Sequence, residues 1–544
     1  MGESLPQRRD YDVLVVGGGH NGLTAACYLA GAGLSVAVLE RLGHTGGAAV
    51  SAQAFSGYPT RLSRYSYLVS LLPDTIAADL GLGVRLASRP VASYTPVLRD
   101  GVAAGLLVER PEGQATRDSF RSLTGSDAEY AAWRDFYRQV SELAAVVAPT
   151  LTGPLPRESE LRRQTDPAVW ADLVERPLGA AIERRFRDDT VRGVVATDAL
   201  IGTFARLHDP SLIQNRCFLY HLIGNGTGEW RVPVGGMGAV TGALAAAAAK
   251  AGAELVTGAE VTAIRANRGG SQGYGQDHGA EVDIAGSHGT GTRTLRARFV
   301  LANVAPWVLT GLLGAERDPA AKPVGAQLKV NILLSRLPRL KSGADPRVAF
   351  AGTLHLGEDY SDLERAYAEA AAGQVPSRLP GEVYCHTLTD PSILGRVPDG
   401  THTLTYFGLH LPATLFADPA TRAERRELAV RRAIASLDEH LLDPVESVVA
   451  RDAAGRPCIE AKIPQDIEAD LGMPGGHIFH GDLAWPWAPD AAGADADAPG
   501  TPAARWGVDT GLDRVLLCGS GARRGGAVSG LGGHNAAQAV LELA

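Results

Sequence analysis

Three glycines near the start of the chain have the spacing of a phosphate-binding loop. Gly17, Gly19 and Gly22 form a G-x-G-x-x-G between the apolar run YDVLVV and a segment that favours a helix. In this pattern the glycines allow a tight turn, close approach of a pyrophosphate, and close packing of helix on strand. Glu40 ends the next apolar run, where a carboxylate can bind ribose hydroxyls. The sequence predicts a dinucleotide-binding β-α-β unit; the alternative is a tight turn followed by an unrelated acid.

Glycine-rich segments recur at wide spacing along the rest of the chain. A second glycine turn, RLGHTGGAA, follows Glu40, and the chain closes with LLCGSGARRGGAVSGLGGHNAA. This arrangement resembles the FAD-dependent phytoene desaturase and amine oxidase superfamily. Residues 230–264 and 299–307 resemble that superfamily's strand-helix-strand return and the strand after it.

Within the superfamily, the chain resembles the group called pyridine nucleotide-disulfide oxidoreductase domain-containing protein 2, which is related to carotenoid desaturases and retinol saturase. The matching segments are GGGHNGL, GGAAVS, SRYSYLVSLLP, GTGEWRVPVGGMGA and KIPQDIEADLGMPGGH. The five cysteines form no C-x-x-C, so no dithiol relay is expected. A second strand-linked G-x-G-x-x-G for a nicotinamide is also missing, so dioxygen or a quinone is the expected electron acceptor.

The resemblance implies an α/β fold with two domains. A discontinuous, Rossmann-type FAD-binding domain would comprise residues 1–75, 229–318 and 505–544. A mixed-sheet α+β substrate domain would comprise residues 76–228 and 319–504, where KVNILLSRLP and THTLTYFGLHL read as strands. The active site is expected at the domain interface, over the flavin.

The resemblance also implies that both glycine-rich ends of the chain hold one FAD molecule. The first loop would bind the pyrophosphate, and the closing segment would lie at the isoalloxazine ring. A helix N-terminus after Gly530, capped by His534 or Asn535, would stabilise negative charge on the reduced ring; the alternative is an ordinary C-terminal helix. The expected cofactor-binding residues are Gly17, Gly19, His20, Asn21, Gly22, Glu40, Arg41, Gly46, Gly47, Ala48, Val261, Gly519, Ser520, Gly530, His534 and Asn535.

Two arginines depart from the family's pattern. Arg523 and Arg524 stand where the family more often has His-Pro. Arginine there could bind an anionic group of the substrate or stabilise the reduced flavin, or it could face solvent. In SRYSY, Arg64 and Tyr65 are expected by resemblance to wall the active site, with packing at the domain junction as the alternative.

Aromatic and imidazole side chains complete the expected substrate site. Tryptophans suit a flat or apolar ligand, although they are also common core residues. His208 and His221 flank DPSLIQNRCFLY, and either could be a general base. The expected catalytic residues are Arg64, Tyr65, His221 and Arg523, and the expected substrate-pocket residues are Trp230, Trp485, Trp487 and Arg524. No spacing of histidine, cysteine and acidic residues predicts a metal site.

Charge and composition argue against other classes of protein. A net charge of −8 disfavours nucleic acid as a partner. The long apolar run AVTGALAAAAAKAGAELV contains Lys250 and Glu254, so no membrane span is expected, and peripheral membrane contact stays open. MGESLPQRRDYD lacks the apolar core of an export signal, so a cytoplasmic location is expected.

The sequence therefore predicts a flavin-dependent dehydrogenase or oxidase. It would create a C=C or C=N bond in a small, biosynthetic substrate by hydride transfer to flavin N5, with oxygen reoxidising the flavin. One alternative keeps the flavin for isomerisation, saturation or oxygenation of an unsaturated substrate. Another is a non-catalytic carrier of a lipid or prenyl-protein, but such a carrier would be expected to lose the pyrophosphate loop.

Overall fold

The computed structural model describes residues 6–266, 279–285, 292–490 and 500–544, and within them the chain forms two large β-sheets. The first sheet has eight strands in the order β10-β11-β12-β1-β2-β9, with β19 pairing β12 and β18. They are β1 (Asp10–Val16), β2 (Val36–Glu40), β9 (Glu254–Thr257), β10 (Val261–Ala266), β11 (Ala280–Ala285), β12 (Thr292–Ala302), β18 (Asp509–Leu512) and β19 (Val515–Leu517). β1 is parallel to β2 and β12, β2 to β9, and β12 to β19. This parallel core is the Rossmann-type arrangement that the sequence predicted.

Both faces of the first sheet are covered. Val13 and Val15 of β1 pack with the helical layer, whereas Leu14 and Val16 pack with the β10–β11 hairpin and Leu309. Alternate side chains of one strand therefore enter two apolar layers, which explains the continuous apolar run in the sequence. The helices of the first layer are α1 (His20–Gly31), α10 (Met237–Ala251), α17 (Pro502–Trp506) and α18 (Leu531–Leu543), and α11 (Pro306–Leu312) lies on the other face.

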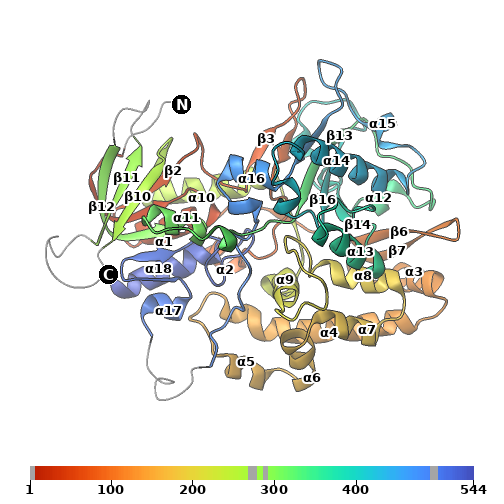
Figure 1. Ribbon diagram of the computed structural model, residues 1–544, viewed down its shortest axis with the longest axis horizontal. Helices are drawn as coiled ribbons and strands as arrows, with labels where there is room; N and C mark the ends of the chain where they lie inside the picture. The colour runs from red at the N-terminus through yellow and green to blue at the C-terminus, as the bar shows by residue number, and fades with distance from the viewer. Residues whose placement is uncertain (1–5, 267–278, 286–291, 491–499) are drawn as a thin grey trace.

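The second sheet has seven described strands, in the order β17-β13-β16-β15-β14-β6-β7. Its pairs are antiparallel except β14–β6, so the sheet is mixed as predicted. The strands are β6 (Val91–Arg99), β7 (Val102–Glu109), β13 (Leu328–Leu334), β14 (Thr353–Leu356), β15 (Gly381–Tyr384), β16 (His402–Gly408) and β17 (Ile459–Lys462). Figure 1 shows this sheet at one end of the long axis and the first sheet at the other.

One face of the second sheet carries an apolar core, in which Val330, Ile332 and Val383 pack against Ala433 and Leu437 of α14. The helices on this side of the molecule are α12 (Pro346–Ala349), α13 (Tyr360–Ala371), α14 (Arg422–Asp438), α15 (Val445–Val448) and α16 (Pro464–Leu471). The opposite face of the same strands carries polar side chains, which become important at the site described below.

A separate helical layer lies beneath the second sheet in the view of Figure 1. Its helices are α3 (Gln114–Thr124), α4 (Ala128–Val147), α5 (Glu158–Gln164), α6 (Pro167–Trp170), α7 (Leu178–Arg185), α8 (Asp189–Thr197) and α9 (Ile213–Leu222). Trp133 and Phe136 of α4 share one apolar core with Phe186 and Phe218, and this core reaches Leu531 of α18. The helical layer is therefore packed onto the dinucleotide half of the molecule as well.

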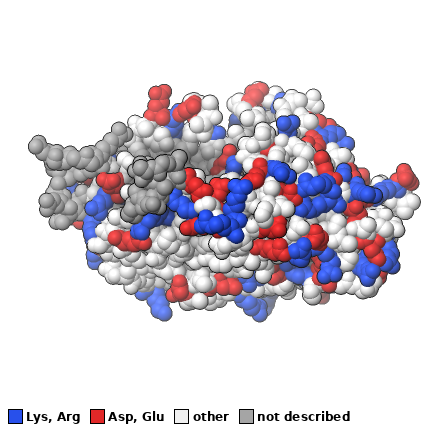
Figure 2. All heavy atoms as spheres, turned by 90° about the horizontal axis from the view of Figure 1, so that it is seen from below, with Lys and Arg blue, Asp and Glu red and all other residues white. Residues whose placement is uncertain are grey.

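Short elements connect the two sheets: α2 (Asp74–Asp79) and the two-stranded ribbons β3 (Ser51–Gln53)–β4 (Arg61–Ser63) and β5 (Leu86–Ala87)–β8 (Val232–Pro233). Among the described helices, none is both long enough and apolar enough to cross a bilayer. Figure 2 shows acidic and basic side chains interspersed over one face of the molecule.

Candidate functional site

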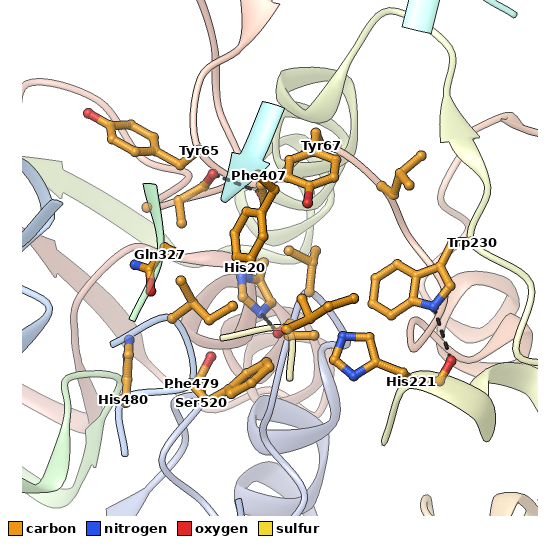
Figure 3. A pocket seen from close by; sticks show the side chains of 18 of the residues that line it. His20, Tyr65, Tyr67, His221, Trp230, Gln327, Phe407, Phe479, His480 and Ser520 are labelled. Carbon is orange, nitrogen blue, oxygen red and sulfur yellow. Dashed lines mark hydrogen bonds between the residues drawn. The ribbon is translucent and has the colours of Figure 1, made fainter. Parts of the chain in front are cut away.

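A cavity of about 860 Å³ runs between the two sheets. That volume lies toward the upper part of the ~300–1,000 Å³ range of small-molecule and cofactor sites. Its lining includes Gly17 and Glu40 from the first sheet's loop region, Tyr65 and Ser520, and Trp230 and Glu382. Figure 3 shows Trp230 and His221 on one side of the pocket and Tyr65 and Gln327 on the other. The dinucleotide loop and a chamber under the second sheet thus share one space.

The first glycine loop has a backbone that only glycine accommodates. Gly17 has φ +102, and a Cβ on Gly22 would lie 2.4 Å from the carbonyl oxygen of Gly17. Asn303, at the end of β12, donates from Nδ2 to that same oxygen at 2.9 Å. The turn is therefore held from the residue that follows the neighbouring strand, and Gly17 and Gly22 are required for its shape.

Glu40 is fixed by main-chain donors at the edge of the cavity. Its Oε2 accepts from the N–H of Gly18 and its Oε1 from the N–H of Leu42, both at 2.8 Å. The side chain is buried but lines the cavity, and each carboxylate oxygen keeps a further acceptor position. A pair of ribose hydroxyls would suit these positions.

The first turn of α1 presents uncapped N–H groups beside the loop. Gly19 is the N-cap residue, and no described side chain caps the helix there. Both Gly19 and His20 line the cavity, so a phosphate oxygen can approach the positive end of the helix dipole. The loop, the helix and Glu40 together fit a dinucleotide.

The second glycine turn packs directly on the first. The N–H of Gly46 donates to Gly18 O at 2.8 Å, and a Cβ on Gly47 would lie 3.2 Å from the Cα of Gly19. Gly47 and Ala48 line the cavity, whereas Gly46 does not. Arg41 and Val261 also line it, next to Glu40 and at the start of β10.

The C-terminal segment reaches the cavity through Ser520, Ala527 and Val528. Helix α18 begins at Leu531 with Gly530 in the left-handed region, so His534 and Asn535 lie inside its first turns and do not cap it. That corrects the predicted capping role. Neither residue lines the cavity, nor do Gly519, Gly530, Asn21 and Gly22.

His534 and Asn535 make buried packing contacts instead. His534 lies edge-on to the ring of Tyr28, with centroids 5.1 Å apart, and Asn535 donates to Leu151 O at 3.4 Å. These contacts tie α18 to α1 and to the end of the helical layer.

His221 and Trp230 form one wall of the cavity. Their rings stack with centroids 5.2 Å apart, and Trp230 Nε1 donates to the carbonyl of His221 at 3.0 Å (Figure 3). The Nδ1 of His221 lies 2.8 Å from Cys217 O, which assigns its proton to Nδ1 and leaves Nε2 as the acceptor. Burial lowers the pKa of His221, although Asp198 acts in the opposite direction. His208 lies outside the cavity, hydrogen-bonded to Glu183.

Only one residue of the predicted Arg64–Tyr65 pair lines the cavity. Tyr65 does so and donates its hydroxyl to Asp470 at 2.9 Å. Arg64 forms an ion pair of 2.7 Å with Glu460 and is absent from the lining.

The arginine and tryptophan cluster near the C-terminus also lies outside the cavity lining. Arg523 donates to Trp487 O at 2.8 Å, and Trp485 stacks on Trp487 at 4.8 Å. Arg524 is buried and donates to Thr150 O and Gly153 O at 2.8 and 2.7 Å. The placement expected for these four residues, against the substrate, is therefore corrected: both guanidinium groups donate to main-chain carbonyls instead.

The polar face of the second sheet forms the chamber wall, and none of its residues is among those expected from the sequence. Strand register places Lys329 opposite Phe407, Phe407 opposite Glu382, and Glu382 opposite His355, in one row across the sheet. All four line the cavity. Alternation along the strands is the sequence signal for this face: Lys329 and Asn331 in β13, like Glu382 and Tyr384 in β15, are separated by apolar core residues.

Buried charged groups are concentrated along this row. Lys329 Nζ donates to Ser63 O at 2.8 Å and Tyr65 O at 2.5 Å, and burial lowers its pKa well below the usual value. Burial, with Glu358 nearby, raises the pKa of Glu382 to about 8. His355 pairs through Nδ1 with Glu358 at 2.5 Å. Among the described residues, no group of three or more His, Cys, Asp or Glu side chains is placed to hold a metal ion.

Comparison with known proteins agrees with this architecture. Residues 15–75 match the family model of the NAD(P)-binding Rossmann-like domain. An uncharacterized protein of Mycobacterium tuberculosis is 52% identical over 98% of this chain and 97% of its own length. Mouse pyridine nucleotide-disulfide oxidoreductase domain-containing protein 2 is 29% identical over 98% of this chain and 93% of its own. The structure of cyclohexylamine oxidase from Brevibacterium oxydans aligns with a TM-score of 0.54 at 16% identity, covering 98% of this chain and 99% of that one.

Proposed function

This chain belongs to the family of its mycobacterial relative, with which it shares 52% of its residues over 98% of its length. From this premise we propose that it is an FAD-dependent dehydrogenase or oxidase of the amine oxidase and phytoene desaturase superfamily, which its Rossmann-like segment, its likeness to pyridine nucleotide-disulfide oxidoreductase domain-containing protein 2 and its fold support. Its substrate is a small organic, biosynthetic molecule in which a C–C or C–N bond is oxidised to a double bond. The proposed location is the cytoplasm.

The observation that carries the proposal is the continuity of the cavity. The same space is bounded by the glycine loop and Glu40 at one part and by the Trp230–His221 wall and the polar sheet face at another. A dinucleotide that lies on the loop therefore has room to extend its second ring system toward the chamber. This arrangement supports an oxidoreductase over a protein that only stores a nucleotide.

The chain's residues divide naturally over the parts of FAD. Gly17, Gly19 and the first turn of α1 would bind the pyrophosphate, and Glu40 would accept from ribose hydroxyls. Ala48 and Ser520 would lie along the part nearer the chamber, since both line the cavity beyond the loop. Bound FAD would supply the two-electron acceptor for the C–H bond that breaks.

The chamber residues would orient the substrate and remove its proton. Trp230, Phe407 and Phe479 offer apolar surface that excludes water around a flat substrate. His221, held by its Nδ1–H bond to Cys217 O, directs an unprotonated Nε2 that can take a proton released on oxidation. Dioxygen or a quinone is the proposed electron acceptor, because the sequence contains neither a C-x-x-C nor a second strand-linked G-x-G-x-x-G.

Flavin content tests the proposal directly. Purified protein is expected to show flavin absorbance, and Gly22→Ala is expected to lose it because the new Cβ would lie 2.4 Å from Gly17 O. Gly31→Ala is the matched control in the same helix, where a Cβ meets nothing within 4 Å. A folded, colourless wild-type protein that takes up no FAD would rule the proposal out and favour the carrier alternative.

Anaerobic mixing separates dehydrogenation from the other flavin-dependent reactions. A dehydrogenated substrate leaves its electrons on the protein, so the flavin absorbance bleaches and returns when dioxygen or a quinone is added. Turnover without net bleaching would instead indicate isomerisation.

A further inference from the structure

Arg89 is a buried cation in the chamber without an acidic partner. Arg89 is 6% exposed, lies just before β6 and lines the cavity. Within the described residues it forms no ion pair, and its one hydrogen bond runs from an Nη to Thr353 Oγ1 at the long distance of 3.3 Å. The ring of Tyr384 lies under the guanidinium, 5.5 Å from its carbon to the centroid. Most of its five N–H donors are thus unused.

The acidic groups nearby are engaged elsewhere or can become neutral. Glu358 pairs with His355, and Glu382 accepts from the Tyr384 hydroxyl. Burial raises the pKa of Glu382 to about 8 and also raises the pKa of Asp198. A buried carboxyl group can avoid the free-energy cost of burying a charge by taking up a proton, whereas a guanidinium does not lose its proton in a protein.

A second arginine strengthens the positive field at this place. Arg110 also lines the cavity, and its nearest acidic partner among the described residues, Glu229, is 3.9 Å away. Burial lowers the pKa of Arg89, and the positive charge of Arg110 acts in the same direction, so the charge on Arg89 is unfavourable without an anion beside it. An anionic ligand group would offset the cost of burying the Arg89 charge and the cost of its repulsion by Arg110.

We infer that the substrate carries a carboxylate and that Arg89 binds it. This inference rests on the proposed function and narrows its substrate class to small organic acids. A planar carboxylate can accept two parallel N–H bonds from one guanidinium, which fits the unused donors of Arg89. A pure hydrocarbon would leave Arg89 unpaired and is therefore not the substrate.

Three probes of similar size test the inference: 3-phenylpropanoate, its planar neutral counterpart 3-phenylpropanamide, and the cationic 3-phenylpropylammonium. Their binding to the purified protein is measured by calorimetry, which does not depend on turnover. The carboxylate is expected to bind about tenfold more tightly than the amide, and the ammonium more weakly than either. Equal binding of carboxylate and amide, or a preference for the ammonium, would overturn the inference.

Two substitutions assign the preference to Arg89. Arg89→Gln is expected to bind carboxylate and amide equally, and Arg89→Lys to keep part of the difference. Arg99→Gln is the matched control, since Arg99 lies at the other end of β6 with an exposed ion pair to Asp188. An Arg89→Gln protein that keeps the full preference contradicts the assignment; if that variant does not fold, Arg89→Lys and the wild-type comparison decide.

The outcome separates the inference from the proposed function. Flavin absorbance is recorded on the same preparations. Yellow wild-type protein without carboxylate preference refutes the carboxylate inference and leaves the flavin proposal standing, whereas colourless protein with that preference refutes only the flavin proposal.

Discussion

Gly533 of α18 lies directly against the main chain of Asn21 in the first turn of α1. A Cβ on residue 533 would stand 1.9 Å from Asn21 O. Gly532 is also confined, because a Cβ there would lie 2.6 Å from Gly519 O and 2.7 Å from Cys518 O. The glycines of the C-terminal segment thus allow the last helix to press onto the helix that starts at the phosphate loop.

Gly533→Ala is therefore expected to displace α18 from α1 and to weaken both folding and FAD binding. Overpacking of this kind costs about 1–3 kcal/mol or more, since main-chain atoms must move. Thermal unfolding and flavin content are the measurements. Gly242→Ala, in α10 with nothing within 4 Å of its Cβ, is expected to leave both unchanged. A Gly533→Ala protein of wild-type stability would show that the two helices are not held at this distance.

Asn303→Ala is expected to lower FAD affinity without unfolding the protein. The substitution removes the Nδ2 donor to Gly17 O, so the glycine turn loses its anchor on β12. One such hydrogen bond contributes about 1 kcal/mol, which corresponds to a several-fold increase in the dissociation constant. Titration of apoprotein with FAD measures it. Unchanged affinity would mean that the turn holds its shape alone.

His221→Asn is expected to slow flavin reduction by a substrate by about 10²–10⁴-fold, the usual contribution of a general base. Flavin content should stay unchanged, since His221 lies in the chamber and not at the loop. Because burial lowers the pKa of His221, the wild-type rate should decline only as the pH falls below the ordinary value near 6.5. His208→Asn, outside the cavity, is the control. Equal rates for both variants would remove His221 from the reaction.

Arg524→Met is expected to destabilise the fold by about 2–4 kcal/mol, because carbonyl groups of Thr150, Gly153 and Trp506 would lose a buried donor. Carboxylate binding should be unaffected, since Arg524 does not line the cavity. Denaturant unfolding and the 3-phenylpropanoate titration distinguish these effects. Weakened binding with normal stability would restore the substrate role expected from the sequence.

His410→Asn is expected to make the protein more resistant to acid. Burial lowers the pKa of His410 to about 3, below its value near 6.5 in the unfolded chain. The neutral, buried ring therefore leaves the free energy of unfolding at its full value above pH 6.5, and that free energy decreases as the pH falls below 6.5. At pH 5 the loss is about 2 kcal/mol. Asparagine tolerates the positive φ of 55 at this position.

Melting temperatures between pH 7 and pH 4.5 test this prediction, and the wild-type protein should lose more stability over that range than the variant. His44→Asn, at an exposed position, should follow the wild type. Identical slopes for all three proteins would show that His410 is not buried in its neutral form.

The dinucleotide half of the molecule could be predicted because its signals are local. Gly17, Gly22 and Glu40 lie within one β-α-β unit, and their spacing alone fixes their relation. The chamber could not be predicted in the same way. The neighbours Glu382 and His355 come from separate strands, and no local sequence pattern indicates the register in which those strands pair. Alternation along each strand indicated a polar face, but not what that face would meet.

The arginine pair shows the opposite limitation. Arg523 and Arg524 were unusual for the family, and an unusual charge suggested contact with the substrate. Whether a guanidinium points into a cavity or toward main-chain carbonyls depends on the path of residues 150–153, far away in the sequence. Arg89, which does face the cavity, stands in the unremarkable segment LASRPVASY.

Alternate residues along the strands of the second sheet point to opposite faces, and the two faces have different roles. Val330, Val383 and Leu354 are committed to the core on one side, and Lys329, Glu382 and His355 stand in the cavity on the other. A change at one of the cavity positions alters what the chamber recognises without removing a single core contact. Substitutions on this face can therefore change the ligand that the chamber accepts, while the glycine loop and Glu40 on the first sheet keep the proposed FAD site.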